Sequence, residues 1–372
     1  MRRPGITLLE VLSAIFIAGI GLLSLLTLFP LGALKMLESV NDDRAAQAGG
    51  NAKAIANAVV MRLDPDVQAA MLNQVIPSTG AGPLFPPALI TSPVPADGPG
   101  LPVLVDPIGV LAYTGQGLWP SWAGGTQYVV PRMRGQWLRP LNPVLGLTTA
   151  DYIRWCTLLD DINFSTNNDQ GATVATNSVY PGSAMNPPAW AGGIGQVERI
   201  PRFTYGWMLR MPRAAAPNVV DVSVLVFAGR SLDFVGFSNQ EGAYTAVFNA
   251  PANTVAIYPN ATAGTTAPPD LRRGQWILDT SLAAPTATTP LSVRGFFYRV
   301  VSVSDPAVDA NGNTYVTAEV QTPLRGWTTP DPAFQIYPPQ PGFPPSSIPT
   351  VGQLGSVLVF DSLLEVFDDG TF

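Results

Sequence analysis

The chain begins with one long stretch in which hydrophobic residues follow one another without a charge. The run extends from Val11 to Leu34, with Glu10 directly before it and Lys35 directly after it. At the rise of an α-helix, this run is about 36 Å long, which exceeds the roughly 30 Å hydrocarbon core of a bilayer. The pattern therefore predicts a helix that spans a membrane over residues 11–34.

The helical pattern continues beyond the uncharged run. Apolar residues recur at steps of three or four on one face of this segment, namely Ala48, Ala52, Ile55, Val59 and Leu63. The spacing predicts a long N-terminal helix over 6–74, half-buried in its second part, in which Pro30 can introduce a kink. Asp64 followed by Pro65 is typical of the cap and the first residue of a further short helix.

The later part of the chain has the pattern of β-strands. Segments rich in β-branched and aromatic residues lie at 203–209, 219–227, 276–278, 296–303, 315–321, 357–360 and 363–367. Asn311 and Gly312 separate two of these segments and are typical of a hairpin turn. We therefore predict an α+β fold, in which a long N-terminal helix with a membrane-spanning first half packs on a mainly antiparallel β-sheet head with Pro/Gly-rich insertions.

Glu10 is the most informative polar residue of the amino-terminal stretch. An ionisable group inside a membrane is expensive, and such groups are usually functional and have a partner. In the alternative interpretation, Glu10 lies at the headgroup level, close to Arg2 and Arg3, and has no role. A secretory signal peptide would need a shorter apolar core followed by a small-residue cleavage site, and an ordinary uncleaved anchor is the remaining interpretation of the run.

The residues around Glu10 form a motif, Gly5-Ile6-Thr7-Leu8-Leu9-Glu10-Val11-Leu12. This motif resembles the cleavage and methylation site of type IV prepilins and of the pseudopilins of type II secretion. The resemblance implies that a prepilin peptidase cuts after Gly5 and methylates the new amino terminus at Ile6, where family members often carry Phe. It also implies that Glu10 pairs with the amino group of Ile6 on a neighbouring pilin-like subunit, so that Glu10 is an assembly residue.

The resemblance and the charges together imply a location and a division of the chain. Arginines precede the apolar run and only Lys35 follows it closely, which places the amino end in the cytoplasm. We expect a single-pass inner-membrane protein with a periplasmic or extracellular head, and a place in a surface fibre is compatible with this topology. The expected parts are a leader at 1–5, the helix at 6–74 and a β-rich head at 75–372, either undivided or with a subdomain around 108–200.

Composition excludes several classes of function. The chain has no histidine, so it has neither a Ser-His-Asp triad nor a histidine metal ligand. A net charge of -6 and only two lysines, Lys35 and Lys53, argue against a nucleic-acid partner, whose phosphates need clustered basic residues. The single cysteine, Cys156, excludes an internal disulfide and is expected to be a buried small hydrophobe.

One cluster of oxygen ligands leaves a metal open as an alternative. Asp305, Asp309, Asn311 and Asn313 fall within one expected turn. Some pseudopilins bind calcium through loops of the head, and these residues are weak calcium candidates. The glycine of this turn stands two positions too early for a helix-loop-helix calcium loop, and a hairpin turn rich in Asp, Asn and Gly needs no metal. We therefore expect no cofactor.

These observations favour a non-enzymatic pilin-like subunit of a type IV pilus or a type II secretion pseudopilus. The head is larger than is usual for the family, which favours a minor or tip subunit over the major one. The first alternative is a membrane-anchored surface binding protein whose adhesin-like head recognises a ligand and does not assemble into a fibre. The second alternative is a hydrolase tethered to the membrane, which the absence of histidine disfavours.

Overall fold

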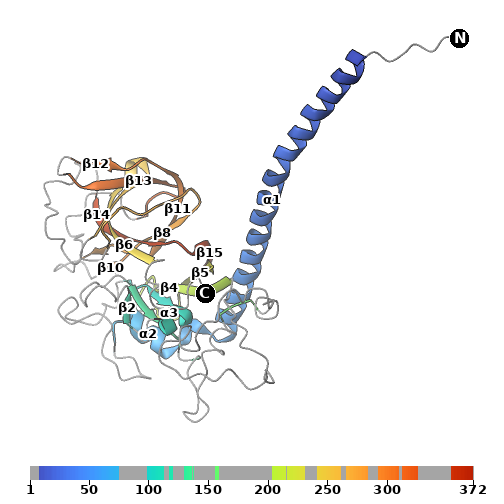
Figure 1. The fold of residues 1–372 in the computed structure, drawn as a ribbon. Helices are drawn as coiled ribbons and strands as arrows, with labels where there is room; N and C mark the ends of the chain where they lie inside the picture. The colour runs from blue at the N-terminus through green and yellow to red at the C-terminus, as the bar shows by residue number, and fades with distance from the viewer. Residues whose placement is uncertain are drawn as a thin grey trace, which may run out of the picture. The chain divides into compact units, whose positions relative to one another are not determined.

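The fold is described from a computed structural model of the chain (Figure 1). The structure describes residues 8–74, 99–112, 117–119, 130–135, 137, 156–158, 203–214, 216–230, 241–260, 265–283, 292–309, 312–325 and 353–371. Two compact units result, Met1–Gln47 and Ala48–Phe372. The first unit consists of most of one helix, and the second holds the end of that helix together with all strands.

The chain starts with helix α1, which runs from Leu8 to Ala58 and contains Pro30. The helix ends before Val60, whose φ of 48° lies in the left-handed region. A short 3₁₀ turn, Met61–Leu63, and helix α2, Pro65–Met71, follow. The side chain of Asp64 accepts hydrogen bonds from the backbone N–H groups of Asp66 and Val67, so the predicted cap at Asp64 and Pro65 is confirmed.

The first sheet has six strands in the order β15-β5-β4-β1-β3-β2. Their bounds are β1 Val103–Val105, β2 Gly117–Trp119, β3 Val130–Met133, β4 Phe203–Arg210, β5 Asp221–Ala228 and β15 Leu363–Thr371. Strands β1 and β3 pair in parallel and the other neighbours pair antiparallel. Helix α3, Pro107–Ala112, follows β1 directly. The side chains of β4 from 203 to 209 are all buried, which shows that both faces of the sheet are covered.

The second sheet closes on itself. Its strands are β6 Glu241–Asn249, β7 Thr254–Tyr258, β8 Trp276–Asp279, β11 Phe296–Val303, β13 Thr314–Val320 and β14 Gln353–Phe360. They follow one another in the order β11-β8-β14-β6-β7-β13, and the pairing of β11 with β13 completes a barrel of these strands (Figure 1). Alternate residues such as Val255 and Ile257 point into the barrel core, as the two-residue period of a strand requires.

Smaller elements complete the barrel region. Strand β12, Ala307–Val308, pairs with the start of β13, strands β9 (Leu282–Ala283) and β10 (Ser292–Val293) pair with each other, and a 3₁₀ turn at Ala250–Ala252 joins β6 to β7. A second apolar core contains residues of both sheets, including Leu225 and Phe227 of β5 and Leu358 and Phe360 of β14. This second core therefore lies between the six-stranded sheet and the barrel, whereas the first core lies inside the barrel.

The predicted strands match the structure closely. Each of the seven segments coincides with a strand, in chain order β4, β5, β8, β11, β13, β14 and β15. The hairpin needs a correction, because β12 intervenes between β11 and β13 and forms the tight turn with β13 itself. Strand β11 still pairs with β13, with a register shift between Val300 and Ser302.

The predicted fold class is wrong. The sequence predicts a membrane-spanning helix packed on an antiparallel sheet, whereas the described strands form two sheets, one closed as a barrel and the other containing the parallel pair β1–β3. The physical reason is that strand pairing connects segments far apart in the chain. Strand β14, for example, inserts between β6 and β8, and the alternation of β14 alone contains no information about these neighbours.

The prediction of a transmembrane helix is also contradicted. Among the residues that the structure describes, no helix combines the length and the hydropathy that a bilayer crossing requires. The single-pass inner-membrane location with a cytoplasmic amino terminus, which rests on this helix, is corrected with it.

The end of α1 packs closely on the six-stranded sheet. Trp207 of β4 is fully buried, and its indole Nε1–H donates a 2.9 Å hydrogen bond to the backbone carbonyl of Ala52. Gly49 permits a close approach as well, because a Cβ atom at this position would lie 2.7 Å from Cε2 of Phe367 on β15. The small residues of this helical segment therefore have a packing role.

Replacing Trp207 by phenylalanine tests this contact. We expect Trp207→Phe to lower the free energy of unfolding by about 1–3 kcal/mol, because it removes one buried hydrogen bond and part of a buried ring. Chemical denaturation of the full chain measures the effect. Trp276→Phe is the matched control, because the Nε1–H of Trp276 makes no hydrogen bond with the described residues. An equal loss in both variants would contradict a role for the Ala52 hydrogen bond.

Candidate functional site

The first candidate site is the exposed surface of α1. Its large apolar side chains are between 46% and 81% exposed at Leu8, Leu9, Val11, Leu12, Ile15, Phe16, Ile17, Ile20, Leu22, Leu23, Leu26, Leu34, Met36, Leu37 and Val40. Successive residues of a helix point about 100° apart, so Ile15, Phe16 and Ile17 face three different sides. The apolar surface therefore surrounds the helix instead of forming one stripe.

Glu10 lies in the first turns of this surface. It is exposed, and its carboxylate makes no hydrogen bond or ion pair with any of the described residues. Its backbone carbonyl accepts a 3.0 Å hydrogen bond from the hydroxyl of Ser13. The predicted processing residues, Gly5 and Ile6, lie outside the described residues, so the pairing between Glu10 and Ile6 stays a prediction.

The next charged residue after Glu10 along the chain is Lys35. Its ammonium group forms a 2.6 Å ion pair with Glu38 on the exposed surface of α1. The pair raises the pKa of Lys35 through its hydrogen bond and its charge interaction with Glu38. A pair this exposed contributes little to stability. Between Glu10 and Lys35 the sequence of the helix contains no charged residue.

The calcium candidates lie around the turn between β12 and β13. Asp309 accepts hydrogen bonds from the backbone N–H of Asn313 at 2.9 Å and from its side-chain amide at 3.2 Å. Gly312 has a φ of 86°, as a tight turn of this kind favours. Asn311 lies outside the described residues. The described residues contain no group of three or more acidic, histidine or cysteine side chains that could hold a metal.

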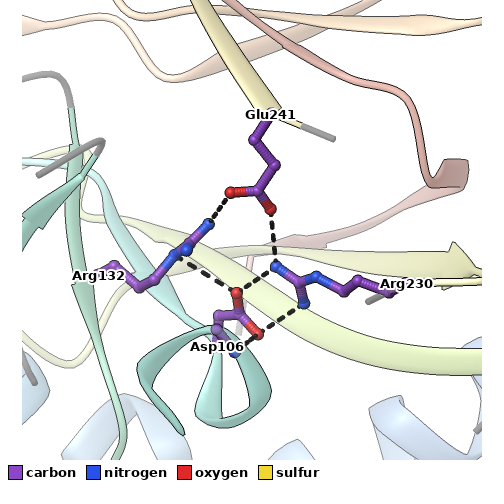
Figure 2. A network of polar contacts seen from close by, with 5 residues as sticks. Asp106, Arg132, Arg230 and Glu241 are labelled. Atoms are coloured by element: carbon purple, nitrogen blue, oxygen red, sulfur yellow. Dashed lines mark hydrogen bonds and ion pairs between the residues drawn. The ribbon is translucent and has the colours of Figure 1, made fainter. Parts of the chain in front are cut away.

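A second polar constellation lies inside the molecule and was not predicted. Four charged side chains meet where the six-stranded sheet adjoins the barrel (Figure 2). Asp106 follows β1, Arg132 lies on β3, Arg230 follows β5, and Glu241 begins β6. All four side chains are at most 3% exposed. They form a buried ion network between the two sheets.

The geometry of the buried ion network is that of alternating charges. The guanidinium of Arg230 donates two hydrogen bonds to the carboxylate of Asp106, at 2.8 and 2.5 Å, and a third to Glu241 at 3.0 Å. Arg132 donates to Glu241 at 2.9 Å, and its Nε lies 3.4 Å from Asp106. The backbone N–H of Gly109 also donates to Asp106 at 3.0 Å. Two guanidinium groups and two carboxylates therefore balance one another.

Burial and charge act in opposite directions on these groups. Burial raises the pKa of Asp106, but the charges of Arg230 and Arg132 and the hydrogen bonds outweigh it, so the pKa of Asp106 is lowered. Burial dominates at Glu241, whose pKa is raised despite both arginines. The pKa of Arg230 is raised, because its two carboxylate partners outweigh burial. Arg230 also lies 4.0 Å from the ring centroid of Phe227.

The buried ion network is structural in its chemistry. Its side chains are withdrawn from solvent, and within the described part of the chain their charges engage one another. Removing one partner from such a network leaves a buried charge without a partner. The free energy lost in this way exceeds the net free energy that the intact network contributes to stability. The network therefore links the six-stranded sheet, through Arg132 and Arg230, to Glu241 at the start of β6 in the barrel.

Local sequence signals for the buried ion network are weak. Its four members are spread over 106–241 and follow no motif spacing. The one usable signal is that Arg132 stands in an apolar context, Val130-Pro131-Arg132-Met133, in a chain with few charges. A charged residue in a strand that reads as buried needs a partner of opposite charge. The sequence around Arg132 does not indicate which acidic residue that partner is.

Cys156 lies close to the network. It is fully buried, as its apolar context predicts. Burial raises the pKa of its thiol well above the usual range, and the charge of Asp106 raises it further. A thiol in this environment stays protonated and unreactive.

Comparisons of the chain with known proteins identify no relative. The chain matches no family model, no curated protein and no solved structure. The resemblance of Gly5 to Leu12 to the prepilin motif therefore stands on those residues alone.

Proposed function

We propose that the chain is a non-enzymatic pilin-like subunit, minor or at the tip, which is processed after Gly5 and assembles through α1 into a type IV pilus or a type II secretion pseudopilus. The observation that supports this proposal is the exposed apolar surface of α1, which at Ile15, Phe16 and Ile17 faces three different sides of the helix. Assembly through α1 would bury this surface. The motif from Gly5 to Leu12 supplies the class of fibre.

The shape of the apolar surface favours several partners over one. Covering a single large apolar side chain is worth roughly 1.5–3 kcal/mol, so leaving fifteen of them exposed is a large cost to an isolated chain. A helix that is apolar all round is normally surrounded by protein or lipid. A groove on one partner would cover only one face. Neighbouring copies of the same kind of helix cover all of them, as the core of a fibre does.

Glu10 gives this packing a register. A carboxylate enclosed among apolar helices needs a positive partner, because an unpaired buried charge is strongly unfavourable. Cleavage after Gly5 would create a free amino group at Ile6. On a neighbouring helix displaced along the fibre axis, this group can reach Glu10, whose carboxylate is uncommitted among the described residues. A neighbour that slips along the axis loses the pair.

Mass spectrometry of the mature chain tests the processing step. We expect the chain to begin at Ile6 and to carry one methyl group on its amino nitrogen, because the motif predicts cleavage after Gly5. Gly5→Val serves as the control, because a bulky residue at the cleavage position should leave the precursor uncut. A mature chain that still begins at Met1 would contradict the proposal.

A further inference from the structure

A cavity in the head lies between the barrel and the six-stranded sheet. Its lining includes three arginines, Arg210 at the end of β4, Arg299 on β11 and Arg325 after β13. Trp276 and two phenylalanines of β11 provide an aromatic wall. The whole chain is acidic, so a convergence of three arginines in one cavity runs against its average charge.

The cavity contains buried donors without acceptors. The Nε–H of Arg210 and the indole Nε1–H of Trp276 are both buried, and neither has a hydrogen-bond partner among the described residues. An unsatisfied buried donor is unfavourable, and more so when the group is charged. Both residues line the same cavity. A ligand that only accepts hydrogen bonds would satisfy them together.

The guanidinium groups of the three arginines lie near aromatic rings, which orient them and leave their positive charge unpaired by the ring. The guanidinium of Arg210 lies 4.5 Å from the ring centroid of Phe296, and that of Arg325 lies 5.5 Å from the same ring. Arg299 lies 5.7 Å from the ring centroid of Trp276. Stacking of this kind orients a guanidinium while leaving its N–H groups available. The positive side of the cavity is therefore preorganised.

Carboxylates also lie in and near the cavity. Asp368 also lines it, but one of its oxygens accepts a 2.6 Å hydrogen bond from the hydroxyl of Ser223. Arg299 and Glu365 are 3.7 Å apart, a long separation for an ion pair. Burial lowers the pKa of Arg210, and Asp368 and Asp221 oppose this effect without cancelling it. Within the described part of the chain, neither Asp368 nor Asp221 makes a hydrogen bond or ion pair with Arg210 or Arg325, so an added anion could contact both guanidinium groups.

We propose that this cavity binds a carboxylate attached to a flat apolar group. The carboxylate oxygens would accept from the guanidinium groups of Arg210 and Arg325 and from the indole of Trp276, and the apolar part would lie against Phe297. Arginine favours such a planar, two-oxygen partner. The binding site belongs to the head and is independent of assembly through α1.

Calorimetric titration of the full chain with three small probes tests the proposal. Benzoate carries both the charge and the ring, acetate only the charge, and benzamide only the ring. We expect benzoate to bind more tightly than acetate, and benzamide not to bind. Arg210→Gln should raise the Kd for benzoate about tenfold or more, because it removes a charged hydrogen bond.

Two further variants keep the test decisive. Arg325 is exposed, so Arg325→Gln should leave the fold intact and still weaken benzoate binding. Arg272→Gln removes the same charge from an exposed residue paired with Asp270, outside the cavity, and should leave the Kd unchanged. Absence of benzoate binding, equal binding of benzamide, or equal weakening by Arg272→Gln would each overturn the proposal. Inorganic phosphate binding as tightly as benzoate would contradict the preference for a carboxylate.

Discussion

A chain carrying Glu10→Gln is expected to be cleaved after Gly5 like the wild type and then to be missing from fibres. Glutamine has the size of glutamate, so the substitution removes only the negative charge. In the fibre, the amino group of Ile6 on the neighbouring subunit would then be buried without a partner. Because an unpaired buried charge is worth several factors of ten in an equilibrium, incorporation should fall at least about tenfold. Immunoblotting of purified fibres against whole cells measures this fraction.

Glu38 provides the matched control for Glu10. It lies on the same helix, is also exposed, and its ion pair with Lys35 involves only neighbours on α1. Glu38→Gln makes the same chemical change, and we expect normal incorporation. If Glu10→Gln is incorporated as well as Glu38→Gln, the charge of Glu10 has no part in assembly. The cleavage assay is separate, so processing and assembly can fail independently.

Arg230→Met is expected to destabilise the head more than any other single substitution considered for it. Arg230 makes three hydrogen bonds inside the buried ion network and is fully buried. Its loss leaves Asp106 and Glu241 with one guanidinium between them. Breaking a buried ion pair in this way costs about 3–5 kcal/mol of unfolding free energy. Urea denaturation of the full chain, followed by tryptophan fluorescence, provides the measurement.

A second substitution should restore much of this loss. Asp106→Asn combined with Arg230→Met removes one charge of each sign and leaves the pair between Arg132 and Glu241 intact. Asparagine can still accept the hydrogen bond from the backbone of Gly109. We expect the double variant to be more stable than Arg230→Met alone. A double variant as unstable as the sum of both single losses would show that charge balance is not what the network supplies.

The strands that the sequence predicts well are those with a local pattern. In β5, Val222, Val224 and Val226 are buried, and their spacing of two residues predicts a strand with these side chains on one buried face. Strands β6 and β7 lack a prediction, because small residues such as Gly242 and Ala246 weaken the apolar signal of β6. Where local chemistry decides the structure, as at the Asp64 cap, the sequence is sufficient.

Features that depend on distant pairing could not be predicted. Closure of the barrel requires β11 to pair with β13 and β14 to insert between β6 and β8. The spacing of residues within each strand does not indicate which other strands it pairs with. The buried ion network unites residues as far apart as Asp106 and Glu241 for the same reason. The membrane-spanning prediction was wrong because it rested on an uncharged run alone. Three residues of the prepilin motif, Gly5, Ile6 and Thr7, lie outside the described residues.

The position of β14 and β15 in the fold has a consequence for the order in which the head can fold. Strand β14 is a central strand of the barrel and β15 pairs with β5 in the six-stranded sheet, although both come last along the described chain. A ribosome must therefore have made residues up to 360 before the barrel has all its strands, and up to 371 before the six-stranded sheet has them. Until then, the open flanks of β6, β8 and β5 expose unpaired backbone groups, which are prone to aggregation. Both sheets therefore receive a strand that the chain supplies only after β13, and neither can be complete before that strand is made.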